Sequence, residues 1–456
     1  MSNDKLDCLG GSLVPILNGD VYEGFDPKLA IPNYTISQQR LESYPPTTSI
    51  SGVTSNGNSV LVEWNVPYSE GSYYNLSESF FECQIRFPAA AVWTDNSGPS
   101  PFFLDSMVTQ AWTYVGSTLL SDMASVNTYP FMSLGKACLV EPEGNCLTPY
   151  GNNRLNTIEE MRYLHVPLFG IQASAANQLV SLIYIKNFIQ GNGNTLYCRL
   201  RLADGIWLAK GLIPASNSLR IQLQLNLLQG LQIVANSQQL INGAVTMQSM
   251  NFNLKRVILT PEADSAFHAA HIQRPLQMST LYARVETLNI PGTSTNFSGR
   301  IFQSQRLPQV IVFFIKNLVN DTSYPFIGCG YNATSTPISF YIRSNGRQIP
   351  FVGGTPQRMG VTSYQRYVDQ CLDDEHPFLT YDQWISGVAR PWVFTIDEDD
   401  EAKMYAIAPK DEQAAIDVYI QFSIAPGVNM TLYAVAFNNA SVSFFSDGRI
   451  ETAGYV

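Results

Sequence analysis

The sequence predicts an all-β protein made of two tandem eight-stranded jelly-roll barrels, a double jelly roll with long loops and a few short helices. Apolar and polar residues alternate through most of the chain, and this period of two is the pattern of a half-buried strand. Aromatic residues reach 12%, which favours strands over helices. With 456 residues, the chain is too long for one ordinary core. Two β domains of roughly 200 residues each exceed an immunoglobulin sandwich and suit jelly rolls.

Alternation in the first half predicts a system of antiparallel strands. Apolar side chains recur at every second position in residues 60–66, 81–87, 196–202 and 221–227. Successive side chains of a strand point to opposite faces of the sheet, so each segment buries one face and exposes the other.

The second half contains two further kinds of strand signal. Residues 310–315 are continuously apolar, which is typical of a strand buried on both faces. Residues 416–424 alternate, and residues 428–436 alternate after the turn Ala425-Pro426-Gly427. This pattern predicts a β-hairpin, in which the two segments pair with each other.

Residues 261–275 separate the two sets of strands, since they contain two prolines and no alternation. We interpret this segment as the connection between the domains. The predicted layout is an extended N-terminal arm at 1–45, the first jelly roll at 46–260, a linker at 261–290 and the second jelly roll at 291–456. The arm is rich in proline and polar residues, and we expect it to be ordered only when something binds it. A tail without a role is the alternative.

Two segments fit the capping box that starts a helix. In residues 157–160 and 380–383, a Thr is followed three positions later by Glu or Gln. The Thr hydroxyl and the Glu or Gln side chain can satisfy the first free amide groups of a helix. Glu159 and Glu160 could instead be acid and base groups of an active site, but capping explains them with fewer assumptions.

The charge balance argues against a protein that coats nucleic acid. The formal net charge is −10, and no run of basic residues is longer than two, whereas phosphate neutralisation requires clustered Lys and Arg. No stretch approaches the roughly 18 apolar residues of a membrane helix. The N-terminus has no apolar core of signal-peptide length, so we expect the protein to be made and kept in the cytosol or nucleus.

The cysteines show no metal or redox spacing. Their number is odd, no Cys-x-x-Cys pair occurs, and we expect reduced, mostly buried side chains. The only short-range pair that could be oxidised is Cys138 with Cys146, although intracellular proteins seldom use disulfides. The positions are Cys8, Cys83, Cys138, Cys146, Cys198, Cys329 and Cys371.

Candidate sites for catalysis or metal binding are weak. The one close histidine pair is His268 and His271, which we interpret as exposed imidazoles of a linker or short helical turn rather than zinc ligands. The acidic run at 397–401 could hold calcium, but consecutive residues of an extended segment point in opposite directions, which favours a solvated loop. The Gly-x-Gly segments at 191–193 and 328–330 are not followed by a helix pattern. The sequence therefore predicts no enzyme and no catalytic, cofactor-binding or metal residues.

Several motifs carry a resemblance to a known family. In the C-terminal half they are residues 306–315, Tyr331-Asn332 and residues 338–350, which end in an Asn-Gly turn followed by a proline. In the N-terminal half they are residues 102–107 and 127–131. In order and spacing, the chain resembles the double-jelly-roll major capsid proteins of Polinton-like viruses, adintoviruses and virophages. Tyr331-Asn332 departs from the family, whose members usually have an Asn-Pro-Phe element there.

The resemblance implies a structural protein of the virion, assembled in the host cytoplasm or nucleus. It implies a homotrimer of pseudo-hexagonal outline that tiles the icosahedral shell of a double-stranded DNA virus. The implied partners are neighbouring capsomers, penton proteins and minor or cement capsid proteins, without sequence-specific binding of nucleic acid. Contact with an internal membrane stays open. The alternatives are a carbohydrate-binding or carbohydrate-active jelly-roll protein, with carboxylates such as those at 373–375, and a minor virion protein of a vertex or spike.

Overall fold

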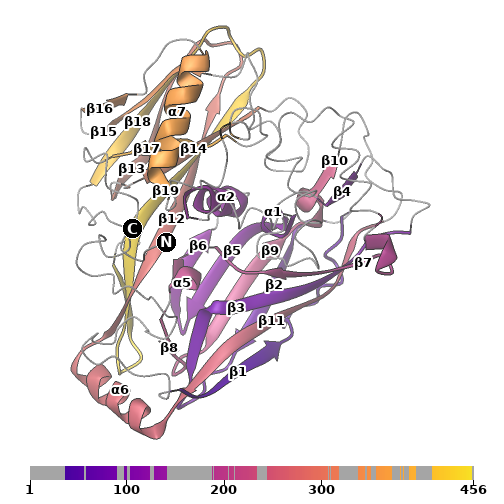
Figure 1. The fold of residues 1–456 in the computed structure, drawn as a ribbon, viewed down its shortest axis with the longest axis vertical. Helices are drawn as coiled ribbons and strands as arrows, with labels where there is room; N and C mark the ends of the chain where they lie inside the picture. The colour runs from indigo at the N-terminus through magenta and orange to yellow at the C-terminus, as the bar shows by residue number, and fades with distance from the viewer. Residues whose placement is uncertain are drawn as a thin grey trace, which may run out of the picture.

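The protein is an assembly of antiparallel sheets in the computed structural model (Figure 1). The structure describes residues 36–55, 58–89, 97–99, 103–123, 128–140, 187, 189–203, 205–209, 211–233, 244–306, 308, 310–317, 337–344, 347–350, 356–371, 381, 384, 390–396 and 413–453.

The first barrel consists of two facing sheets. One sheet has the order β1 (Ile36–Tyr44), β11 (Thr246–Leu259), β3 (Tyr73–Arg86) and β7 (Thr195–Leu200), with the short β8 (Ile213–Pro214) on β3. The other has the order β2 (Val60–Val66), β9 (Leu219–Leu225), β5 (Val108–Val115) and β6 (Thr118–Met123). A small ribbon pairs β4 (Ser97–Pro99) with β10 (Leu231–Ile233).

The second barrel has the same construction. One sheet has the order β12 (Leu276–Ile290), β19 (Met430–Phe444), β14 (Val310–Asn317) and β17 (Trp392–Thr395), with β20 (Ile450–Ala453) on β19. The other has the order β13 (Asn296–Arg306), β18 (Gln413–Phe422), β15 (Pro337–Ser344) and β16 (Arg347–Pro350).

The two barrels share one strand order. If the eight sheet strands of each barrel are counted along the chain, leaving out the short β4, β8, β10 and β20, one sheet reads first, eighth, third, sixth. The other sheet reads second, seventh, fourth, fifth, and this is true of both barrels. This order is a jelly roll, in which the chain crosses between the sheets. The predicted fold class, a double jelly roll, is confirmed.

Alternation identified the inward faces correctly. In β9, Ile221, Leu223 and Leu225 are fully buried, while the polar residues between them face outward. The continuous segment 310–315 is buried at every position, as predicted. Inside the second barrel, Phe313 packs against Phe340 and Phe394. The opposite face of the strand is covered by a helix of the first barrel, as described below.

Helices connect or cover the sheets. Those of the described residues include α1 (Phe103–Met107), α2 (Thr128–Val140), α5 (Gly205–Leu208), the 3-10 helix η5 (Leu227–Gly230), α6 (Pro261–Gln273) and α7 (Pro356–Gln370). Figure 1 shows α2 between the two groups of strands and α6 at one end of the molecule. The capping box at 157–160 lies outside the described residues. From the one at 380–383 only Tyr381 is described, and it is helical.

Two parts of the expected layout differ from the structure. Residues 36–44, expected in the arm, form β1 and pair with β11. Residues 276–290, expected in the linker, form β12 and pair with β19 along their whole length. Both strands lie at sheet edges, where mostly exposed or mixed side chains hide the alternation that marks a strand. The connection itself, at 261–273, is the helix α6.

The predicted hairpin between residues 416–424 and 428–436 is wrong. The two segments are β18 and β19, and they belong to different sheets. The turn between them packs on the loop that joins β12 to β13, where the amide of Gly427 donates to the carbonyl of Gly292 at 2.8 Å. Gly427 has φ +76°, a left-handed conformation that glycine adopts without strain. Alternation shows which face a residue takes, but it does not identify the partner strand.

Candidate functional site

The histidines weighed as metal ligands, His268 and His271, lie on α6. Within the described ranges, no group of three or more His, Cys, Asp or Glu side chains could hold an ion. His268 is exposed and lies 3.7 Å from Asp264, as expected for a solvated pair. His271 is buried and its Nε2 lies 2.8 Å from the carbonyl oxygen of Phe444, so the prediction that it is exposed is wrong. The acidic segments at 373–375 and 397–401 lie outside the described residues.

Four of the cysteines lie in the core, as predicted. Cys83, Cys138, Cys198 and Cys371 are buried. Burial raises the pKa of the Cys198 thiol well above its ordinary value, and a buried thiol of this kind is chemically inert. The other three cysteines lie outside the described residues.

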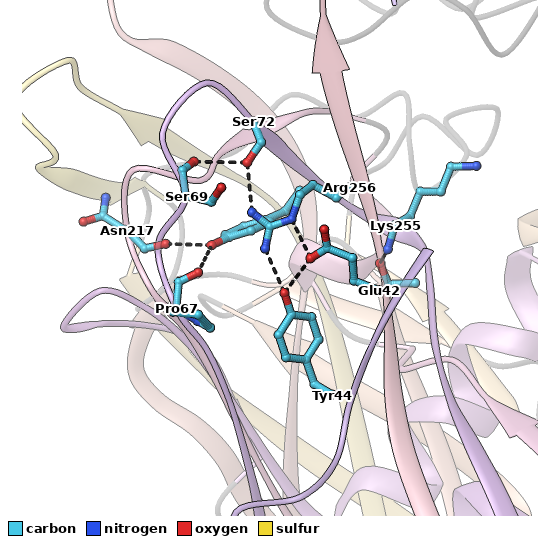
Figure 2. Close-up of polar contacts among 10 residues, drawn as sticks. Glu42, Tyr44, Pro67, Ser69, Ser72, Asn217, Lys255 and Arg256 are labelled. Carbon is cyan, nitrogen blue, oxygen red and sulfur yellow. Dashed lines mark hydrogen bonds and ion pairs between the residues drawn. The ribbon is translucent and has the colours of Figure 1, made fainter. Parts of the chain in front are cut away.

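An extensive polar cluster surrounds Arg256 of β11, as Figure 2 shows. Its Nε donates to Oε2 of Glu42 at 2.9 Å, and its two terminal nitrogens donate to the hydroxyls of Ser72 and Tyr44, each at 2.9 Å. The Tyr44 hydroxyl in turn donates to Glu42 at 2.6 Å. Arg256 is 5% exposed, so this buried charge is satisfied by an acid and two hydroxyls.

Strand register brings these groups together. Arg256 pairs with Arg40 of β1 on one side and with Tyr74 of β3 on the other. Two residues along β1 from Arg40, the side chain of Glu42 lies on the same face, within reach of the guanidinium group. The guanidinium carbon also lies 5.4 Å from the centre of the Tyr74 ring. The cluster thus fixes the edge strand β1 to the interior of its sheet.

The cluster continues toward the second barrel. The Tyr74 hydroxyl is 3.2 Å from the carbonyl oxygens of Pro67 and Asn217, both of which can accept its hydrogen bond. The side-chain amide of Asn217 donates to the carbonyl of Gly448 at 3.2 Å, in the turn between β19 and β20. Burial is the main cause that raises the pKa of Tyr74 to about 12.

The helix α6 links the same two barrels a second time. Thr260 caps the helix by accepting from the amide of Ala263, and Pro261 occupies its first turn. Tyr73 of the first barrel donates to Asp264 at 2.6 Å, and its ring makes an edge contact of 4.9 Å with Phe267. Farther along the helix, His271 bonds to Phe444 of the second barrel as described above. The helix is therefore anchored to both barrels rather than being an unattached linker.

A third contact is apolar and involves α2. The ring of Phe131 stacks on Tyr433 of β19, with the ring centres 3.7 Å apart, and lies 5.6 Å from Phe314 of β14. At Gly135 the helix comes close to the strand, since an added Cβ atom would lie 3.4 Å from Phe437. This helix of the first barrel covers the outer face of the second barrel, which explains why 310–315 is buried on both faces.

Together these contacts form a junction, which we define as α2, α6 and the Arg256 cluster. Its charged groups Arg256, Glu42 and Asp264 bond to other residues of the junction. The arrangement holds two barrels in one fixed relation. The parts that Arg256, Asn217 and Phe131 play in the junction were not predicted from the sequence. Arg256 could have been found from the sequence, because a charged residue at an inward position of an alternating strand indicates a buried polar contact.

Among the described helices, none combines the length and the hydropathy that a membrane span requires.

Comparison with known proteins identifies the fold. No protein-family model and no curated protein sequence matches the chain. The crystal structure of the mavirus major capsid protein is similar with a TM-score of 0.55 and 10% identity, over 91% of this chain and 90% of that one. A chain of the Sputnik virophage structure gives 0.57 and 11%, over 95% and 93%. The PBCV-1 virus capsid model gives 0.51 and 10%, over 91% and 97%. The likeness spans both barrels and establishes a shared fold.

Proposed function

We propose that this chain is a major capsid protein that forms homotrimers of pseudo-hexagonal outline, and that these trimers tile the icosahedral shell of a double-stranded DNA virus. The observation that carries the proposal is the repetition of one strand order in two barrels of a single chain. The similar chains named above come from virus capsids and virophages, which supports the same role.

The junction gives this proposal a physical basis. Three chains around a three-fold axis would present six similar barrels, which approximates a hexagon only if the barrels of one chain keep a fixed angle. The Asn217 hydrogen bond to Gly448, the anchored α6 and the stacked Phe131 all oppose rotation of one barrel against the other. A shell protein needs this rigidity, whereas an enzyme with two domains commonly needs the domains to move.

The proposed role implies binding partners and argues against enzyme activity. We infer contacts with neighbouring capsomers, penton proteins and minor or cement proteins, and we infer that the chain is not an enzyme. The formal net charge of −10 supports a shell that leaves contact with the genome to other components. We propose residues 36–259 as the first barrel, α6 as the connection and residues 276–453 as the second barrel. The segment before residue 36 is our candidate for docking minor capsid proteins.

Electron microscopy of the purified chain tests the proposal. Negative-stain class averages should show particles with three-fold symmetry and six lobes around a centre. Particles with two lobes, at concentrations where capsid proteins assemble, would contradict it. A second measurement concerns the genome. The purified trimer should not bind duplex DNA tightly at physiological salt, and tight binding would contradict the inference that other components contact the genome.

A further inference from the structure

The helices α2 and α7 occupy equivalent places in the two barrels. Each lies between the fifth and sixth sheet strands of its barrel, α2 between β6 and β7 and α7 between β16 and β17. Each also contacts the fourth strand of its own barrel, β5 or β15. The two helices also lie next to each other. Cys371 directly follows α7, and its thiol lies 3.4 Å from the carbonyl oxygen of Cys138 in α2. The two helices are therefore successive members of a repeating arrangement.

Within the chain, the helix of the first barrel packs on the second barrel. The helix α2 reaches beyond its own barrel and contacts β12 and β19, the first and eighth strands of the second barrel. Ala283 and Val285 of β12 pair with Phe437 and Val435 of β19, so all four share the outer face of that sheet. All four are less than 9% exposed. The outer face of the second barrel is thus covered by a helix from the preceding barrel.

No equivalent helix of the described residues covers the corresponding face of the first barrel. Its first strand, β1, is exposed at most positions, and Leu41 is 55% exposed. Glu42 and Tyr44 turn toward Arg256, so Leu41, which directly precedes Glu42, lies on the opposite, outer face of the sheet. On α7, Val361 is 58% exposed. The outer face of the second barrel is thus buried under α2. In contrast, both α7 and the outer face of β1 expose an apolar side chain, Val361 and Leu41 respectively.

We propose that α7 of one copy covers the outer face of β1 and β11 in a neighbouring copy, as α2 covers β12 and β19 within the chain. The occupant of this face is thus a second copy of the same chain, and the contact is the junction between the second barrel of one subunit and the first barrel of the next. This inference rests on the proposed trimer and names the surfaces that form it. Val361 and Leu41 lie in this contact.

The outer face of the first barrel is more polar than that of the second. Asn251 and Asn253 of β11 alternate with inward-facing apolar residues, and Lys255 of the same strand forms an ion pair of 3.4 Å with Glu78. The exposed side of α7 carries Gln365 and Asp369 beside Val361. The contact between copies is therefore mixed, with apolar residues among polar ones, which suits subunits that are made as separate soluble chains before they assemble.

Cross-linking between cysteines tests the contact. The full-length double variant Leu41→Cys, Val361→Cys is purified, treated with a short bismaleimide and examined on denaturing gels. We expect covalent dimers and trimers that are absent from either single variant, which also controls for native cysteines. The matched control is Leu61→Cys with Val361→Cys. Leu61 is 47% exposed, but it lies on β2 in the opposite sheet of the first barrel, and we expect no cross-linked species.

The outcomes separate this inference from the proposed function. If light scattering shows trimers and the Leu41 and Val361 pair does not cross-link, or the control pair cross-links equally well, the contact is wrong and the capsid proposal stands. If the unmodified chain stays a monomer at every concentration tested, both are wrong. The variant Val361→Asp provides an independent test. It should weaken trimer formation at least tenfold, while its monomer unfolds at the same denaturant concentration as the unmodified monomer.

Discussion

The hydroxyl group of Tyr73, on β3 of the first barrel, donates a hydrogen bond of 2.6 Å to Oδ1 of Asp264 on the connecting helix α6. This contact joins a core residue to the helix that leads into the second barrel. Burial and the neighbouring carboxylate both raise the pKa of Tyr73 above its ordinary value. The contact therefore couples the protonation of one phenol to the stability of the junction.

Alkaline conditions should weaken the fold through the buried tyrosines. A pKa raised in the folded state means that the full stability is present below the unfolded pKa, near 10 for tyrosine, and is lost as the pH rises toward the folded value. For Tyr74 that window runs from about 10 to about 12. Each such group should lower the free energy of unfolding by about 1.4 kcal/mol per pH unit above pH 10.

The variant Tyr73→Phe checks this prediction. At neutral pH it should cost about 2 kcal/mol, because a hydrogen bond to a carboxylate is lost. Above pH 10 its free energy of unfolding, measured by urea titration, should fall less steeply than that of the unmodified chain. Equal slopes for the two proteins would show that Tyr73 does not titrate as its buried position requires.

Removal of the central arginine should destabilise the first barrel. Arg256→Met leaves Glu42 without its cation and two hydroxyls without a donor, and loss of one partner of a buried ion pair costs about 3 kcal/mol. The neighbouring Lys255→Met is the matched control. Its ion pair with Glu78 is partly exposed, so its loss should cost less than about 1 kcal/mol. If denaturant unfolding gave the two variants the same stability, the Arg256 cluster would have no special role.

The close approach of α2 to β19 should make Gly135 sensitive to side-chain size. An alanine Cβ atom would lie 3.4 Å from Phe437, which is an ordinary contact, and alanine favours the helix by about 1 kcal/mol. Gly135→Ala should therefore be neutral or slightly stabilising in thermal unfolding. Gly135→Leu should cost about 1–3 kcal/mol, because the larger side chain pushes the helix off the second barrel. Equal tolerance of both variants would argue against this packing.

Gly292 should tolerate no side chain. A Cβ atom there would lie against backbone atoms of Val428, where the loop between β12 and β13 meets the turn between β18 and β19. We expect Gly292→Ala to lower the melting temperature, since backbone must shift to admit even one methyl group. Gly52→Ala is the control, because its Cβ would lie 3.6 Å from a side-chain atom of Val60. Full stability of Gly292→Ala would mean that the two turns do not meet as described.

The fold was largely predictable, because strand faces are encoded locally. Leu223 is fully buried in a strand whose alternation identified it, and residues 310–315 are buried on both sides as their continuous apolar pattern indicated. Strand partners are not encoded locally. The segments 416–424 and 428–436 are adjacent in sequence and alternate well, yet the jelly-roll topology sends them to opposite sheets.

The junction could be predicted only in small part. His271 was predicted to be exposed from its polar linker context, but a carbonyl oxygen 173 residues away in sequence holds it in the interior. Phe131 and Tyr433 meet only when both barrels are complete. Contacts of this kind depend on the folded arrangement of distant segments, and no local pattern in one sequence reports them.

The mass of the purified protein in solution is the most direct test of the claim that this chain is a shell subunit with two rigid barrels. Size-exclusion chromatography with light scattering should give a single species of three times the chain mass of 50.6 kDa, stable on dilution. A species of 50.6 kDa that stays monomeric at high concentration would contradict the account.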